Sequence, residues 1–103
     1  MMVIDLDEVT FDAELDGEEV RRTLARRVWE RRGWATVAAA YEERARDGSW
    51  RPHLAIIRFR RHGEGWKKHA QVTLPGEQAR GLGHLVEALG EQVAADDHDD
   101  DVS

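Results

Sequence analysis

The feature that most constrains the fold of this chain is a pair of alternating segments at residues 53–61 and 66–74. Apolar side chains recur at every second position in both segments, and the polar connection His62-Gly63-Glu64-Gly65 separates them. Alternation on both sides of a short glycine-containing loop is typical of a β-hairpin. The sequence therefore predicts an antiparallel hairpin closed by about three to five loop residues.

Each strand of this hairpin should carry one apolar and one polar set of side chains, because successive side chains point to opposite faces. The apolar set comprises Ala55, Ile57, Phe59, Ala70, Val72 and Leu74. The polar set comprises Arg58, Arg60, Lys67, His69, Gln71 and Thr73. We therefore expect one face of the hairpin to lie on the core and the other to be solvated and cationic.

The segment 16–33 carries local signals of a helix. Asp16 suits the N-cap position, acidic residues follow in the first turn, and Gly33 suits the end. Val28 and Trp29 are also good strand formers, so a strand is the alternative for the later part. We predict a helix that begins at Asp16.

The segment 34–46 is ambiguous between helix and strand. Its alanines favour a helix, whereas Thr36, Val37 and Tyr41, followed by the turn signal Asp47-Gly48, favour a strand. A lone two-stranded hairpin is marginally stable in water, so the central hairpin requires a neighbour. We therefore predict a third strand at 34–44.

A helix should follow the hairpin. Pro75-Gly76 ends the strand, and an amphipathic stripe follows over residues 77–93. The stripe comprises Leu82, Leu85, Val86, Leu89 and Val93. The predicted fold class is α+β, with an antiparallel three- to four-stranded β-meander packed against a C-terminal amphipathic helix.

The 103 residues suffice for one domain. We expect an acidic N-terminal arm at 1–16, which could be an edge strand, a partner-binding arm or a disordered or loosely docked lead. We also expect a single α+β domain at 17–94 and a disordered acidic tail at 95–103. The ends are expected to be dispensable to the core. The tail could act as a solubiliser, as a tethered competitor for a basic surface, or as a docking peptide for a protein partner.

Several function classes are disfavoured by what the sequence lacks. It contains no cysteine, no secretory signal and no apolar run of the roughly 18 residues that a membrane span needs. Its five histidines show no metal-binding spacing, and no nucleophile or phosphate-loop motif is present. We expect a cytoplasmic protein that is not an enzyme and that uses no metal or cofactor.

Charge is segregated along the chain. The net charge is −6, yet all but one of the 15 basic residues lie between residues 18 and 70. Cations in register on a sheet could hold phosphates, and nearby aromatic rings could stack on unpaired bases. The candidate nucleic-acid-binding residues are Arg51, Arg58, Arg60, Arg61, Lys67, Lys68, His69, Trp50 and Trp66. The alternative interpretation is a solvated sheet face with tryptophans that belong to the core.

Residues Lys67 to Leu85 carry a resemblance. A basic strand ends in Val72-Thr73-Leu74, and Glu77-Gln78 then begins an amphipathic helix. With the upstream Trp50 or Trp66 hairpin, this run resembles the single-stranded-DNA-binding transcriptional positive-coactivator family over about a third of the chain. The resemblance implies a β-meander capped by a helix, dimerisation through the helices, and nucleic-acid contact at Lys67 and Lys68.

The sequence thus predicts a non-catalytic protein that binds single-stranded DNA or RNA, and the resemblance implies a role in transcription regulation. We also expect a homodimer, because a small sheet with open edges gains from a partner. The alternative is a protein-interaction adaptor or dimeric structural module that binds no nucleic acid.

Overall fold

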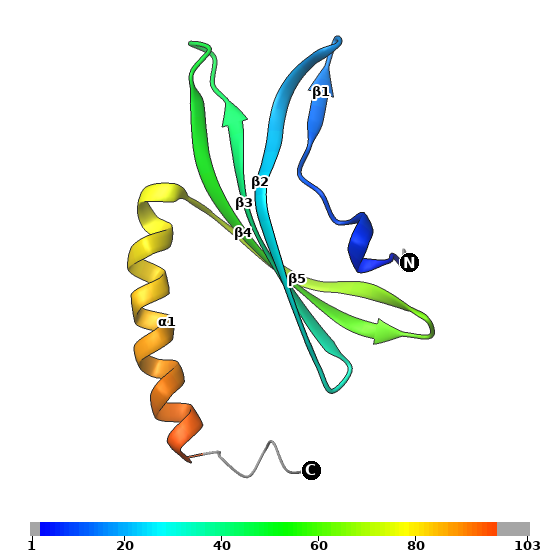
Figure 1. The fold of residues 1–103 in the computed structure, drawn as a ribbon, viewed down its shortest axis with the longest axis vertical. Helices are drawn as coiled ribbons and strands as arrows, with labels where there is room; N and C mark the ends of the chain where they lie inside the picture. The colour runs from blue at the N-terminus through cyan, green and yellow to red at the C-terminus, as the bar shows by residue number, and fades with distance from the viewer. Residues whose placement is uncertain (1–2, 97–103) are drawn as a thin grey trace.

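The computed structural model describes residues 3–96, which form one antiparallel sheet followed by a helix (Figure 1). The five strands are adjacent in the order of the sequence. The elements are η1 (Leu6–Glu8), β1 (Ala13–Leu15), β2 (Glu18–Arg31), β3 (Trp34–Arg44), β4 (Trp50–His62), β5 (Gly65–Pro75) and α1 (Gly76–Asp96). The predicted α+β meander with a C-terminal helix is confirmed, and the sheet is larger than expected.

The helix predicted from Asp16 is wrong, because that segment forms the long strand β2. Asp16 and Gly17, with φ of 53° and 81°, make the tight turn that joins β1 to β2. Arg32 and Gly33, with φ of 52° and 78°, make a similar turn into β3. Two-residue turns with positive φ match the twist of a hairpin, so Asp16 begins a hairpin turn instead of capping a helix.

The strand predicted at 34–44 is confirmed as β3, in the middle of the sheet. It pairs with β2 on one side and β4 on the other, and Val37 lies opposite both Val28 and Ile57. Its alternate residues Ala35, Val37, Ala39 and Tyr41 are buried. Strands lie on both sides of β3, so its inner-face residues belong to the centre of the core.

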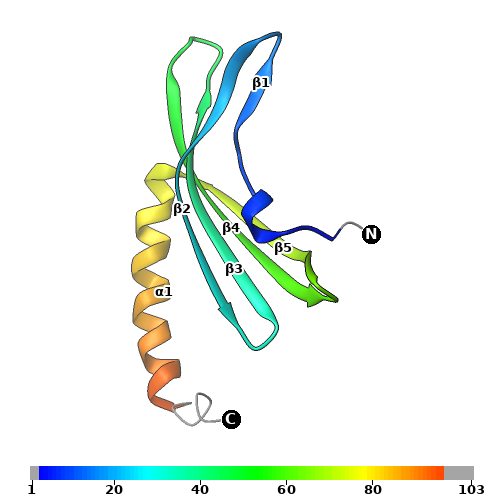
Figure 2. The ribbon, with the colours of Figure 1, turned by 45° about the vertical axis from the view of Figure 1, so that its right-hand side comes forward.

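The N-terminal arm, residues 3–12, packs on the sheet face that carries Val37, Ile57 and Phe59, which we call the inner face. Leu6 is only 7% exposed and Val9 only 9%. Figure 2 shows η1 lying over this face. The expectation that the N-terminal end is dispensable to the core is therefore wrong. The arm supplies the second layer of that core.

The central hairpin is confirmed, with a loop of two residues, Gly63 and Glu64, instead of the three to five expected. A bulge lies farther along, where Phe59 pairs with Lys68 but Arg58 pairs with Ala70. His69 is therefore the extra residue in β5. A bulge of one residue moves every later side chain to the opposite face.

This bulge overturns part of the predicted division of faces. Ala55 and Ile57 lie opposite Thr73 and Gln71, so those two polar residues belong to the inner face. Ala70, Val72 and Leu74, which were expected on the core side with Ile57, lie instead on the outer face. Without the bulge, Ala70 would pair with Ile57, as the alternation predicted.

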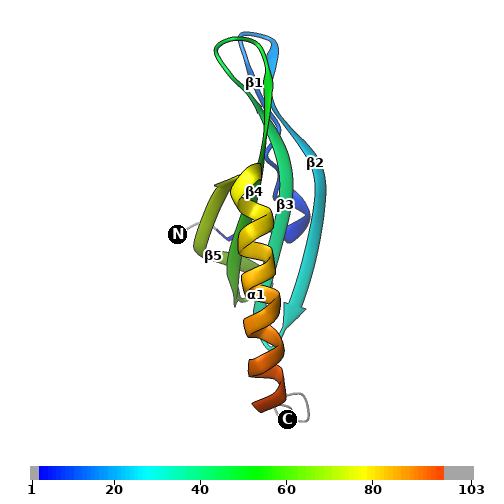
Figure 3. The same ribbon diagram turned by 90° about the vertical axis from the view of Figure 1, so that its left-hand side faces the viewer.

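Helix α1 packs on the outer face near Leu54 and Ile56, against β4 and β5. Ala79, Leu82 and Val86 lie on its contacting side. Figure 3 shows the helix continuing past this contact in front of the sheet. Leu85, Val86, Leu89 and Val93 are about 60% exposed. The helix therefore covers part of one face and leaves most of its apolar stripe in solvent.

Helix α1 reaches Asp96, so it takes in the first residues of the segment expected as a tail. The rest of that segment, residues 97–103, lies outside the described residues, as does its predicted disorder. Among residues 3–96, no helix is long and apolar enough to cross a membrane.

Candidate nucleic-acid interface

A cationic cluster occupies the outer face beyond the helix contact. It consists of Trp34 from β3, Arg58 and Arg60 from β4, and Lys67 and His69 from β5. Trp34 pairs with Arg60, and Arg60 pairs with Lys67, so these three side chains form one row across three strands. We call these five residues the cationic patch. The strand alternation predicted that Arg58, Arg60, Lys67 and His69 would share a face. The pairing confirms this for Arg58, Arg60 and Lys67, and the contact of the His69 ring with Trp34 places His69 on the same face.

Trp34 lies at the centre of the patch. The guanidinium carbons of Arg58 and Arg60 lie 5.0 and 4.7 Å from its ring centroid. The His69 ring meets it edge-on, with the ring centroids 5.0 Å apart and the planes at 85°. Each cation–π contact at an exposed site contributes roughly 0.5 to 1 kcal/mol. The indole therefore favours conformations in which both guanidinium groups lie beside it.

The positive charges of the patch are not neutralised nearby. Arg21, Arg22 and Arg44, at the far end of the sheet, form ion pairs with Glu43, Glu42 and Glu18. Within residues 3–96, Arg58, Arg60 and Lys67 make no ion pair. The patch therefore presents uncompensated cations, which is the arrangement that a polyanion requires.

Strand β2 extends this surface with residues that the sequence reasoning missed. Trp29 lies opposite Thr36, which lies opposite Arg58, and Arg31 lies opposite Trp34. Trp29 is 56% exposed. These residues were missed because the segment was predicted as a helix, where strand alternation does not apply. The turn signals Asp16-Gly17 and Arg32-Gly33 could have revealed them.

Three of the predicted residues lie on the inner face, away from the patch. Lys68 lies opposite Phe59, and Trp66 lies opposite Arg61. Trp66 is 7% exposed and belongs to the core, so it offers no open ring for stacking. The Arg61 guanidinium lies 5.3 Å from the Trp66 ring, and its Nε donates to the Gly63 carbonyl at 3.1 Å.

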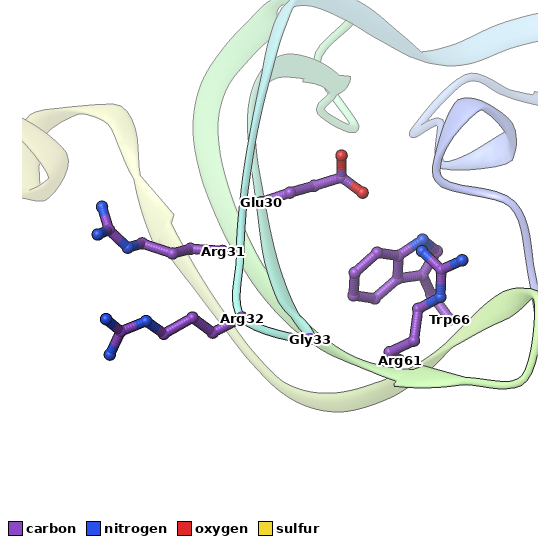
Figure 4. A pocket seen from close by; sticks show the side chains of 6 residues that line it. All are labelled: Glu30, Arg31, Arg32, Gly33, Arg61 and Trp66. Carbon is purple, nitrogen blue, oxygen red and sulfur yellow. The ribbon is translucent and has the colours of Figure 1, made fainter. Parts of the chain in front are cut away.

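Figure 4 shows the hollow beside Trp66, which has a volume of about 440 Å³. Arg61 and Glu30 point into it, whereas Arg31 and Arg32 extend to the other side of the chain. Glu30 brings a carboxylate to this hollow, so its charge is mixed. A nucleic acid that follows the patch on the outer face would not pass through it.

The remaining two predicted residues lie at the opposite end of β4. Trp50 is on the outer face, where the Arg22 guanidinium covers its ring at 4.0 Å, and Arg51 lies 3.9 Å from Asp47. Trp50 and Arg58 are eight positions apart, which corresponds to about 26 Å along an extended strand. The helix contact at Leu54 and Ile56 lies between them. Trp50 and Arg51 therefore do not join the patch.

Comparisons with protein-family models, with curated proteins and with solved structures find no match for this chain. The resemblance to the single-stranded-DNA-binding coactivators stays a prediction.

Proposed function

We propose that this protein binds single-stranded nucleic acid on the cationic patch and performs no catalysis. The observation that carries the proposal is the row Trp34–Arg60–Lys67, with Arg58 beside it, because these cations are in register and have no acidic partner among the described residues. A phosphate backbone supplies several negative charges at regular spacing, and its binding releases counterions.

The aromatic rings give the proposal its preference for unpaired strands. Trp29 offers an exposed ring beside the patch, and base stacking contributes roughly 1 to 3 kcal/mol per base. Every base has a π-face, so such binding tolerates any sequence. The polar groups of the patch are guanidinium, ammonium and imidazole groups, which suit phosphate contacts. The proposed role in transcription rests on the resemblance alone.

The test compares two double variants that remove equal charge. Arg58→Ala with Arg60→Ala removes two patch cations, whereas Arg51→Ala with Arg61→Ala removes two arginines that lie elsewhere. Binding of a labelled single-stranded oligonucleotide is followed by fluorescence anisotropy at about 50 and 200 mM salt. We expect the patch variant to bind more weakly and to lower the salt slope by about 1.4, or about 0.7 for each phosphate that is no longer neutralised.

The control pair should keep the affinity and slope of the unchanged chain. Equal losses in both variants would show that net charge, and not the patch, drives binding. Circular dichroism of both variants verifies that the sheet remains intact. A chain that shows no binding at either salt concentration would refute the proposal.

The second candidate is a protein-interaction adaptor, which the exposed apolar side chains of α1 favour. Leu85, Leu89 and Val93 are each more than 60% exposed on one side of the helix. Large exposed apolar patches mark interaction sites in soluble proteins. Absent oligonucleotide binding would make this the leading function. The acidic tail, as a competitor for the patch or as a docking peptide, belongs to the same set of proposals.

A further inference from the structure

One edge of the sheet is open where an edge strand is usually protected. Strand β1 pairs with β2 only as far as Arg21. From Ala25 to Arg31, β2 has no strand beside it on that side among residues 3–96. This stretch also carries exposed apolar side chains, with Val28 at 43% and Trp29 at 56%. An uncovered edge strand presents unpaired backbone N–H and C=O groups, which are a template for pairing with another strand.

The opposite edge of the sheet, at β5, is protected by comparison. The bulge at His69 interrupts it, and bulges discourage edge pairing. The N-terminal arm also covers part of it, because Ile4 exchanges backbone hydrogen bonds of 2.9 and 2.8 Å with Trp66. The two edges therefore differ: β5 is bulged and partly covered, whereas β2 has no strand beside it from Ala25 to Arg31 among the described residues.

We propose that the partner is a second copy of this chain, joined by antiparallel pairing of β2 with β2 about a two-fold axis at Val28. The backbone direction supports this centre. In a two-residue hairpin the flanking residues, here Arg31 and Trp34, exchange the hydrogen bonds. Backbone groups alternate in direction along a strand, so Arg27 and Trp29 also bond toward β3.

Arg26, Val28 and Glu30 consequently turn their backbone groups toward the open edge. The Arg26 carbonyl agrees with this, because it accepts a hydrogen bond from the Arg27 side chain at 3.0 Å. A two-fold axis at Val28 therefore makes Val28 and its copy a hydrogen-bonded pair. Pairing in this register requires the Arg26 carbonyl to exchange the Arg27 side chain for the backbone N–H of Glu30 of the second copy.

The sequence around Val28 complements itself in this register. Arg26 lies opposite Glu30 of the second copy on the inner face, and Arg27 lies opposite Trp29 of the second copy on the outer face. Symmetry repeats both contacts. Opposite charges and cation–aromatic pairs across neighbouring strands are stabilising, and like charges are destabilising.

Shifted registers lose this complementarity. Axes at Arg26, Arg27 or Glu30 place each of those residues opposite its own copy, so that like charges meet. An axis at Trp29 places Arg27 opposite Arg31. Val28 is the one centre from Arg26 to Glu30 that brings no like charges together along this stretch. The resulting sheet has both outer faces on one side, so the two cationic patches share a surface.

Cross-linking tests this geometry directly. The chain contains no cysteine, so Val28→Cys introduces a single thiol. In a hydrogen-bonded antiparallel pair the Cα atoms lie about 5.5 Å apart, within the range that a disulfide spans. We expect Val28→Cys to form a covalent dimer under mild oxidation. Leu89→Cys, on the exposed stripe of α1, should not.

A charge reversal provides the second measurement. Glu30→Arg converts both Arg26–Glu30 contacts into repulsions, whereas Glu64→Arg makes the same charge change in the β4–β5 loop. Sedimentation equilibrium should show at least tenfold weaker dimerisation for Glu30→Arg alone. Efficient cross-linking at Leu89 without cross-linking at Val28 would assign the interface to the helix and overturn the proposal. An unchanged chain that stays monomeric up to about 100 µM, where a micromolar contact would be populated, would also overturn it.

Nucleic-acid binding is measured separately on the same variants. A monomer that still binds an oligonucleotide would leave the proposed function intact and remove only the dimer. A dimer that binds no oligonucleotide would leave the proposed β2–β2 pairing intact and remove the proposed nucleic-acid binding.

Discussion

The N-terminal arm and helix α1 differ in burial, and in the opposite sense to what their sequences suggest. The N-terminal arm is short and acidic, yet Leu6 and Val9 on it are buried against the inner face. Helix α1 has a long apolar stripe, yet Leu89 on that stripe is 61% exposed. Apolar periodicity therefore shows what a segment is able to bury, whereas the shape of the neighbouring surface decides what it does bury.

The arm packs stably on the inner face because β2 holds it by polar contacts as well as by apolar packing. The Arg26 guanidinium donates to the carbonyls of Leu6 and Val9 at 2.7 and 3.1 Å. The Asp12 carboxylate accepts the Thr23 backbone N–H at 2.6 Å. These contacts satisfy the backbone of a segment that has little regular structure of its own. Helix α1 satisfies its own backbone and therefore needs no such contacts.

The largest expected effect is on the core layer that the arm supplies. Leu6→Ala should lower the free energy of unfolding by about 2 to 3 kcal/mol, because it leaves a cavity beside the inner face. The matched change Leu89→Ala should lower it by less than about 0.5 kcal/mol, since that side chain is mostly in solvent already. Urea denaturation followed by circular dichroism measures both. Similar losses in the two variants would show that α1 is buried in solution, for example by a partner.

A smaller effect is expected at the hydrogen bonds from the Arg26 guanidinium to the Leu6 and Val9 carbonyls, which we call the polar clamp. Arg26→Ala removes two charge-assisted hydrogen bonds to the arm and should reduce stability by about 1 to 2 kcal/mol. Arg27→Ala removes the neighbouring guanidinium, which among residues 3–96 bonds to the Arg26 carbonyl of its own strand and not to the arm, and should have less than half that effect. Amide hydrogen exchange should show faster opening of the arm in Arg26→Ala alone. Equal exchange in the two variants would refute the clamp.

The smallest effect is a dependence on pH at the end of the arm. The Thr23 backbone N–H and hydroxyl hold the pKa of Asp12 below its usual 3.8. A carboxyl whose pKa is lowered by folding stabilises the fold above its ordinary pKa and loses that contribution as pH falls through the lowered value. The Thr23 amide resonance should therefore shift only below about pH 4, and Asp12→Asn should abolish that shift.

Asp47 provides the internal reference for this titration. Its pKa is lowered in the same direction by hydrogen bonds from the Ser49 hydroxyl and N–H, in the β3–β4 turn far from the arm. The Ser49 amide should titrate identically in the unchanged chain and in Asp12→Asn. A change at Ser49 would mean that the substitution perturbs the whole sheet.

Local patterns in the sequence determined a large part of this structure. Alternation and glycine turns fixed the central hairpin, the requirement for a neighbour placed β3 beside it, and helical periodicity placed α1. The parity of β4 alone brought Arg58 and Arg60 together on one face. These features depend on residues close in the chain, so local patterns are sufficient to predict them.

The tertiary structure decided the remaining features, because they depend on how distant segments meet. Segment 18–31 has helix-compatible ends, but hairpin pairing with β3 makes it a strand and brings Trp29 beside the patch. The extra residue at His69 reverses the faces of the later residues of β5, so that Gln71 and Thr73 lie on the inner face and Ala70 and Val72 on the outer face. No local sequence pattern predicts the bulge at His69, and none predicts which segment will cover the inner face of the sheet. The pairing of β4 with β5 produces the bulge, and the packing of the arm covers the inner face. In both cases the face and the burial of a side chain depend on partners far away in the sequence.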